Sequence, residues 1–129
     1  MKLLVVDDSS IIRKIIKAAA DVLEMETEEA QDGIEALEKL STHYKDIDLV
    51  LLDWNMPEMS GYDVLVEIKS SDIYKHIPVM MVTTEGQKSN IVAAVRAGAD
   101  NYLTKPFTVE ELESKILECI GEKDEEDNF

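Results

Sequence analysis

Short apolar runs alternate along this chain with longer segments in which apolar residues recur every three or four positions. The runs 48–52 and 78–83 are apolar on both alternating faces, which is typical of strands that helices cover on both sides. After the first run, Ile11, Ile15 and Ala19 are spaced as in a helix. The alternation predicts an α/β fold in which strand–helix units form a doubly wound parallel sheet.

Five such units are predicted. Strands are expected at 2–6, 27–30, 48–52, 78–83 and 101–104. The helices that follow them are expected at about 10–23, 32–40, 61–70, 87–98 and 108–120. Ser9 or Ser10 can cap the first helix, Gly98 can end the fourth in a left-handed conformation, and Thr108 can cap the fifth.

The length of the chain fits one domain. A chain of 129 residues with 45% hydrophobic content can bury a real core, and we expect a single domain over residues 1–121. The last segment, 122–129, is rich in charged residues and is expected to be a disordered acidic tail.

Composition also limits the partners. Acidic residues number 28 against 13 basic ones, giving a formal charge of -15, which repels the phosphates of nucleic acids and anionic membranes. Direct binding to nucleic acid is therefore not expected. Cys119 is the single cysteine, and no window approaches the roughly 18 apolar residues of a spanning helix. We expect a cytoplasmic protein without membrane insertion.

Polar residues stand at the ends of four predicted strands. In an open α/β sheet, ligands bind beyond the carboxyl ends of the strands, where the strand order reverses. Each of these residues alone is most simply a turn, cap, strand or surface residue, but their joint placement indicates a site. They are Asp7 and Asp8, Asp53, Thr83 and Lys105.

The three carboxylates of this set create an electrostatic problem, because they repel one another in a chain that is already strongly acidic. A cation would relieve the repulsion. Since the candidate ligands are hard oxygens without histidine or cysteine nearby in sequence, they favour Mg²⁺ over Zn²⁺. Mg²⁺ and the Lys105 ammonium group together would neutralise the site, so that an incoming phosphoryl group is no longer repelled.

Asp53 follows a central strand and is the best placed of the three carboxylates to act as a nucleophile. A carboxylate can form an aspartyl phosphate. The metal and Lys105 would stabilise the equatorial oxygens of the transferred group, and the Thr83 hydroxyl could hydrogen-bond the product. The residues therefore predict that Asp53 accepts a phosphoryl group.

Four motifs at these strand ends resemble the receiver domain of two-component response regulators, over positions 2–120. They are VVDDSS, LLDWNMPEMSG, VMMVTTEG and YLTKPF. The likeness is greatest to the single-domain chemotaxis regulators of this family. It implies a flavodoxin-like receiver fold, with five helices around a five-stranded sheet in the order 2-1-3-4-5.

The resemblance makes Asp53 the phosphorylation site of a switch and not the nucleophile of a conventional enzyme. Its chemistry would be limited to self-phosphorylation and autodephosphorylation. The implied Mg²⁺ ligands are Asp7, Asp8 or both, together with Asp53 and the backbone carbonyl of Asn55.

The residues implied to contact the phosphoryl group are Thr83 and Lys105. The family usually has a cis bond at the position of Lys105 and Pro106, in keeping with the higher cis tolerance of prolyl bonds. Asn55 and Glu85 occupy the positions that tune how fast water attacks the acyl phosphate. Both agree with the chemotaxis type, which implies a short-lived signal.

The implied partners are a histidine kinase and a downstream target, such as the flagellar motor switch or another signalling protein. On phosphorylation, Thr83 would move toward the phosphate and Tyr102 would swing inward. The face formed by the fourth helix, fifth strand and fifth helix would then change its affinity for the target. Positions that match the partner surface of chemotaxis regulators are Lys88, Ile91, Tyr102 and Lys115.

Three alternatives compete with this interpretation. A phosphorelay intermediate would pass the phosphoryl group to another histidine, whereas Asn55 and Glu85 favour a fast-decaying switch. An aspartate-nucleophile phosphatase needs a second aspartate two positions after the first, where Asn55 cannot exchange the proton. A flavodoxin-like electron carrier needs a phosphate-cradling loop after the first strand, where DDSS places two negative charges.

Overall fold

The computed structural model describes residues 1–84 and 88–127, with side chains described up to residue 121. Strands and helices alternate along the chain as predicted. The strands are β1 Lys2–Val6, β2 Glu26–Ala30, β3 Leu49–Leu52, β4 Val79–Thr83 and β5 Asn101–Thr104. The helices are α1 Ser10–Val22, α2 Gly33–His43, α3 Gly61–Ser70, α4 Lys88–Arg96 and α5 Val109–Asp127.

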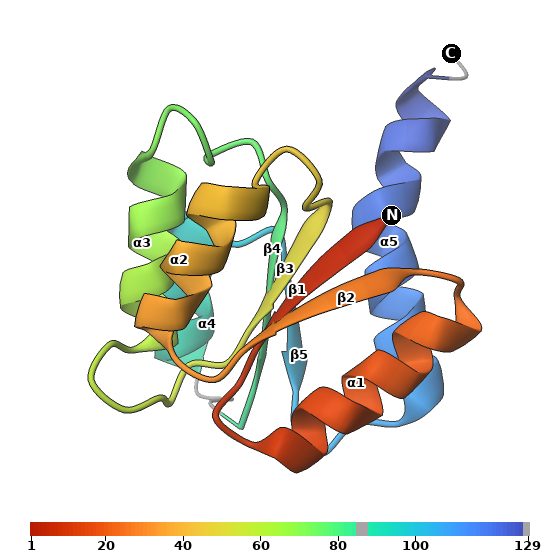
Figure 1. Ribbon diagram of the computed structural model, residues 1–129, viewed down its shortest axis with the longest axis horizontal. Helices are drawn as coiled ribbons and strands as arrows, with labels where there is room; N and C mark the ends of the chain where they lie inside the picture. The colour runs from red at the N-terminus through yellow and green to blue at the C-terminus, as the bar shows by residue number, and fades with distance from the viewer. Residues whose placement is uncertain (85–87, 128–129) are drawn as a thin grey trace.

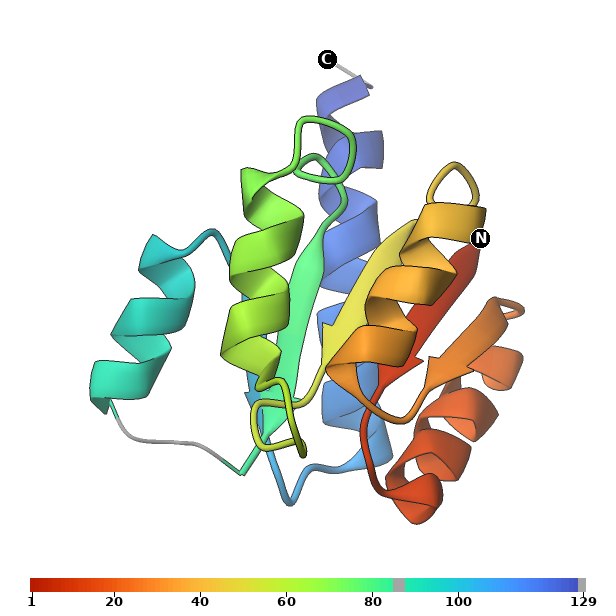
Figure 2. The same cartoon turned by 60° about the vertical axis from the view of Figure 1, so that its left-hand side comes forward.

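The strands form one five-stranded sheet in the order β2-β1-β3-β4-β5, and all neighbours are parallel. Helices α2, α3 and α4 cover one face, and α1 and α5 cover the other (Figure 1). The predicted doubly wound fold and strand order are confirmed. Because Val6 lies opposite Leu52 in the ladder, the residues that follow β1 and β3 meet at the same edge of the sheet. Figure 2 shows the loops after the strands gathered at one end.

Alternate residues of the central strands pack into two separate cores. Leu4 and Val6 of β1 face α2 and α3, whereas Leu3 and Val5 face α1 and α5. A fully buried side chain of this size contributes about 1.5–3 kcal/mol. The helix residues that close the two cores are Ala36, Leu40, Val64, Leu65 and Ile68 on one face, and Ile16, Ala19, Leu112 and Ile116 on the other. The strands are therefore held between two buried cores, which fix the positions of the strand ends.

Side chains fix the starts of the helices by accepting hydrogen bonds from free backbone N–H groups. Ser9 caps α1, because its hydroxyl accepts from the N–H of Ile12 at 3.3 Å. At the start of α5, the Glu111 N–H donates to Thr108 Oγ1 at 3.1 Å, and the Thr108 N–H donates to Glu111 Oε1 at 3.2 Å. Beyond α4, Gly98 has a φ of 106°, which glycine adopts readily. These three predictions are confirmed.

Helix α5 departs from the sequence-based expectation. Helix α5 does not stop near residue 120 but continues to Asp127, since glutamate and lysine are good helix formers even without a buried face. It thus includes part of the segment 122–129 that the sequence predicts to be disordered, and the domain boundary at residue 121 stays a prediction. In α1, Ile11 and Ile15 are 69% and 39% exposed.

None of the described helices is both long and apolar enough to cross a membrane.

Candidate functional site

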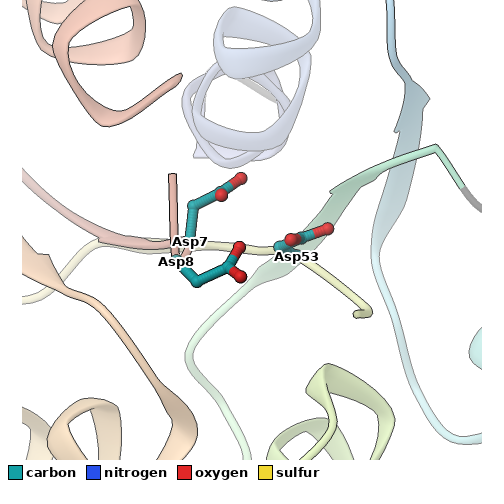
Figure 3. Close-up of side chains that lie close together, drawn as sticks. All are labelled: Asp7, Asp8 and Asp53. Carbon is teal, nitrogen blue, oxygen red and sulfur yellow. The ribbon is translucent and has the colours of Figure 1, made fainter. Parts of the chain in front are cut away.

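Three carboxylates meet where β1 and β3 end. Asp7 and Asp8 follow β1, Asp53 follows β3, and one oxygen atom of each lies within 4.8 Å of the others. Figure 3 shows the three side chains gathered at this edge of the sheet. Asp7 and Asp53 are only 2% and 6% exposed, whereas Asp8 faces solvent. We call these three residues the acidic cluster.

Backbone hydrogen bonds beyond the strands hold the acidic cluster in place. The Asp53 N–H donates to the carbonyl of Val6 at 2.9 Å, and the Asp7 N–H donates to the carbonyl of Ala30 at 3.1 Å. The Asp7 carboxylate also accepts from the N–H of Ser9 at 2.9 Å. The backbone of each buried aspartate is therefore anchored to a neighbouring strand, and its position follows from the sheet register.

Gly61 packs directly against the main chain of Asp53. A Cβ at residue 61 would overlap the Asp53 carbonyl oxygen and would lie 2.9 Å from the Cα of Trp54. The Gly61 N–H in turn donates to the Trp54 carbonyl at 2.8 Å. The loop between β3 and α3 therefore closes tightly on the backbone of Asp53 and leaves no space for a side chain at residue 61.

Lys105 brings a positive charge to the acidic cluster from the connection between β5 and α5. Its Nζ donates to Asp7 Oδ2 at 2.7 Å and lies 3.6 Å from Asp53 Oδ1. Its backbone N–H donates to the carbonyl of Thr83 at 2.9 Å. The peptide bond between Lys105 and Pro106 is cis, as the resemblance predicts. One ammonium group thus faces two of the three carboxylates.

The surroundings of Asp53 disfavour its charged form. Burial raises the pKa of Asp53 above its ordinary value of 3.8, and the charge of Asp7 raises it further, whereas Lys105 and a hydrogen bond with the Thr83 side chain lower it. Asp8 adds a smaller rise. Thr83 is fully buried at the end of β4. The net change is a raised pKa, so Lys105 and Thr83 only partly offset the effects of burial and of the neighbouring carboxylates on Asp53.

The donor set suits a hard divalent cation. The group of described residues that could hold a metal ion consists of three aspartates, without histidine or cysteine. Mg²⁺ binds through one or two carboxylates and retains several waters, and the exposed Asp8 leaves the cluster open to solvent on one side. A dication would also favour the charged form of Asp53 and so offset its raised pKa. The residues therefore fit Mg²⁺.

Two of the predicted residues are not brought into the acidic cluster by any described contact. Asn55 lies two positions after Asp53 and is exposed, and the role of its backbone carbonyl stays a prediction. Glu85 lies outside the described residues, so its part in setting the lifetime of a phosphorylated state also stays a prediction.

The predicted partner residues lie on α4, β5 and α5. Lys88 is the first residue of α4 and is exposed, Ile91 is half-buried one turn later, and Tyr102 is half-buried on β5. On α5, Lys115 pairs with Glu118 at 3.6 Å, and Glu118 accepts a hydrogen bond at 3.0 Å from Asn101 of β5. Helix α5 is thus tied to the edge strand that carries Tyr102.

Sequence reasoning does not identify Arg13 as part of the site. Its Nη1 donates to the Asp7 carbonyl at 2.6 Å, and its Nε donates to Glu29 Oε1 at 3.0 Å. The signal for this contact is a helical arginine one turn after the cap residue Ser9, facing the acidic strand β2. This pattern can be interpreted only once β2 is known to lie beside β1.

Comparison with known proteins agrees with this geometry. The family model for the response regulator receiver domain matches residues 3–117. The chemotaxis protein CheY1 of Helicobacter pylori is 46% identical over 125 residues, which cover 96% of this chain and 100% of that protein. A CheY homolog of Campylobacter jejuni is 43% identical over 127 residues, covering 94% of this chain and 93% of that protein.

Solved structures show the same likeness. A response regulator receiver domain protein from Clostridium thermocellum has a TM-score of 0.86 at 36% identity, covering 95% of this chain and 96% of that one. CheY from Borrelia burgdorferi, solved in a complex with CheX, BeF3 and Mg²⁺, has a TM-score of 0.88 at 28% identity, covering 93% of this chain and 89% of that one. The chain therefore belongs to the response regulator receiver domain family and is homologous to the CheY chemotaxis response regulators.

Proposed function

We propose that this protein is a chemotaxis-type signalling switch that accepts a phosphoryl group on Asp53 from a histidine kinase and then binds a downstream target. The observation that carries the proposal is the meeting of the acidic cluster with Lys105 and Thr83 at one edge of the sheet. Receiver domains of this family are signalling switches and not classical enzymes, and they bind Mg²⁺ at an acidic pocket.

In the transfer step, a carboxylate oxygen of Asp53 attacks the phosphorus atom of a phosphohistidine. An O–P bond forms as the N–P bond breaks, and the electron pair stays on the imidazole nitrogen, which takes up a proton. Lys105 Nζ, 3.6 Å from Asp53, is within reach of an equatorial oxygen of the transferred group. The Thr83 side chain, which hydrogen-bonds Asp53, can donate a hydrogen bond from its hydroxyl group to another oxygen of the phosphoryl group.

The acidic cluster and the backbone carbonyl of Asn55 would hold the Mg²⁺ ion. When bound, Mg²⁺ supplies positive charge that offsets the repulsion between the carboxylates and the incoming phosphoryl group. The chain itself keeps the buried carboxylates in register: Lys105 and Ser9 hold the Asp7 side chain, and the end of β1 holds the backbone of Asp53.

Hydrolysis resets the switch. A water molecule attacks the phosphorus, the bond between phosphorus and the Asp53 oxygen breaks, inorganic phosphate leaves and the carboxylate is restored. Asn55 and Glu85 occupy the positions that tune this rate in the family. Exchanging them should change the lifetime of the phosphorylated state without preventing its formation.

The register of the sheet supports a link from Asp53 to the partner residues. Thr83 lies opposite Thr104, and Met81 lies opposite Tyr102, so a shift of Thr83 toward a phosphoryl group acts on β5 close to Tyr102. We propose that the target binds the face that carries Lys88, Ile91, Tyr102 and Lys115.

Acetyl phosphate tests the chemistry directly. The protein is incubated with this donor and Mg²⁺ and quenched rapidly in acid, and its intact mass is measured by mass spectrometry. Wild type should gain one phosphoryl group, and Asp53→Asn should gain none. Asp72→Asn is the matched control, because Asp72 is an exposed aspartate whose side chain pairs only locally with Lys75, and it should behave as wild type. An adduct on Asp53→Asn, or equal labelling in the presence of a chelator, would contradict the proposal.

A further inference from the structure

The Arg13 side chain connects three parts of the fold. Arg13 lies on α1, and its side chain is only 16% exposed, which is low for an arginine. The Nε group donates to Glu29 on β2 at 3.0 Å, and Nη1 donates to the carbonyl of Asp7 at 2.6 Å. The guanidinium therefore spans the distance from the edge strand to the loop that carries two of the three carboxylates.

The carbonyl that Arg13 holds belongs to the peptide bond between Asp7 and Asp8. The other contacts of Asp7 fix its N–H on Ala30 and its carboxylate on Lys105 and Ser9. Asp8 is exposed. Because Asp8 directly follows the restrained carbonyl, the orientation of that peptide bond helps to set where the Asp8 side chain leaves the backbone.

We propose that Arg13 is a positioning residue for the acidic cluster. Held by Glu29, its planar guanidinium fixes the peptide bond between Asp7 and Asp8, so that both carboxylates stay close to Asp53. The task suits arginine because it presents several N–H groups in a rigid plane and can serve two acceptors at once, whereas lysine offers a single flexible ammonium group. This inference rests on the proposed binding of Mg²⁺ at the acidic cluster.

The direction in which Mg²⁺ affinity changes when Arg13 is replaced distinguishes a positioning role from a simple electrostatic effect. Removing a positive charge near three carboxylates should by itself tighten Mg²⁺ binding. Loss of a residue that orients metal ligands should instead weaken it, typically by tenfold to a hundredfold. We therefore expect Arg13→Ala to bind Mg²⁺ about tenfold more weakly than wild type.

Binding is measured by calorimetric titration of the full chain with MgCl2, with Trp54 fluorescence as a second signal. Lys14→Ala is the matched control, because it removes the same charge from an exposed position next to Arg13 on the same helix, and its affinity should equal or exceed that of wild type. Arg13→Lys keeps the charge but loses the planar fork, and it should bind Mg²⁺ more weakly than wild type. It also provides a test if Arg13→Ala does not fold.

Phosphorylation by acetyl phosphate gives a further readout. At saturating Mg²⁺, Arg13→Ala should regain a labelling rate close to that of wild type, because Arg13 does not touch the reacting atoms. Folded Arg13→Ala and Arg13→Lys that bind Mg²⁺ as tightly as wild type, or more tightly, would overturn the assignment of Arg13 while leaving the proposed function intact. Failure of wild type to bind Mg²⁺ would overturn both.

Glu29 can be tested through Arg13. Glu29→Ala should weaken Mg²⁺ binding by less than Arg13→Ala does, since Arg13 remains. In the double variant, the loss of Glu29 should add nothing to the effect of Arg13→Ala. Fully additive effects would overturn the assignment of Glu29 as the residue that holds the guanidinium.

Discussion

The ammonium group of Lys105 lies 2.7 Å from the carboxylate of Asp7 but 3.6 Å from that of Asp53. Lys105 thus lies closer to Asp7 than to Asp53, the proposed phosphoryl acceptor. Because its side chain is 14% exposed and the Asp7 side chain 3% exposed, their attraction is only weakly screened by water. This pair joins the loop after β5 to the end of β1 across the intervening strands.

Lys105→Ala should separate metal binding from phosphoryl transfer. The variant leaves the repulsion within the acidic cluster uncompensated, so Mg²⁺ should bind at least as tightly as to wild type. Phosphorylation by acetyl phosphate should be slower by about a hundredfold, because a charge that stabilises the transferred group is missing. Mg²⁺ titration and time courses of the intact mass measure the two effects. Lys75→Ala, at an exposed pair, should change neither, and a parallel loss of both in Lys105→Ala would contradict this role.

Asp53→Asn should stabilise the metal-free protein at neutral pH. A raised folded-state pKa contributes stability that is fully present below the unfolded value, near 3.8, and is lost as the pH rises through the folded value. The charged Asp53 therefore opposes folding at neutral pH, and the amide removes that charge. We expect a gain of about 1 kcal/mol, or about 4 °C in Tm for a domain of this size.

Thermal unfolding in chelator over a series of pH values checks this prediction. The advantage of Asp53→Asn should shrink as the pH falls toward 3.8, because wild type then carries less charge on Asp53. Adding Mg²⁺ should raise the Tm of wild type more than that of the variant. Asp72→Asn, at an exposed aspartate outside the acidic cluster, serves as the control. An Asp53→Asn variant less stable than wild type at neutral pH would rule out the explanation.

Gly61→Ala should destabilise the protein and disturb the loop between β3 and α3. The added methyl group would overlap the carbonyl oxygen of Asp53, and this backbone is held by β1, so relief requires movement of the loop. We expect a loss of about 1–3 kcal/mol. Gly121→Ala is the contrasting variant: among the described residues, no atom beyond its own stretch of helix lies within 4 Å of the added Cβ. Alanine in the helix should add about 0.5–1 kcal/mol. Urea unfolding compares the two, and equal changes would contradict the steric argument.

Lys69→Met should reduce stability without affecting phosphorylation. The Lys69 ammonium group donates to the carbonyls of Lys75 and Ile77 and to Asp100 Oδ2, and Asp100 in turn accepts from the N–H of Val79. Losing hydrogen bonds from a charged donor should cost about 1.5–3 kcal/mol. Lys75→Met should stay within about 0.5 kcal/mol of wild type. Urea unfolding and acetyl phosphate labelling provide the two readouts, and a slower labelling of Lys69→Met would show an unexpected link to the site.

The sheet and the meeting of the carboxylates could be predicted because both follow from local patterns. The runs containing Leu49–Leu52 and Val79–Thr83 are apolar on both faces, which identifies central parallel strands. Once strands are parallel, the residues after them must share an edge, so Asp7 and Asp53 come together. The strand order came from the resemblance to receiver domains, since periodicity alone does not order strands.

Other features depend on tertiary context. The spacing of apolar residues identified α1, but it does not tell which of them face the core, because isoleucine and alanine occupy most of its circumference: Ile16 is buried and Ile11 is exposed. The contact of Arg13 with Glu29 requires β2 beside β1. The sequence does not predict the end of α5, because charge-rich sequence suits both a solvated helix and a disordered tail.

Strand β2 forms one border of the sheet, and three of its five residues are glutamates: Glu26, Glu28 and Glu29. If two copies of the chain paired through this border, rows of carboxylates would stand against one another across the junction. Like charges on a border strand oppose the strand-to-strand stacking that leads to insoluble aggregates. The acidic composition of β2 therefore disfavours pairing of two copies through this border.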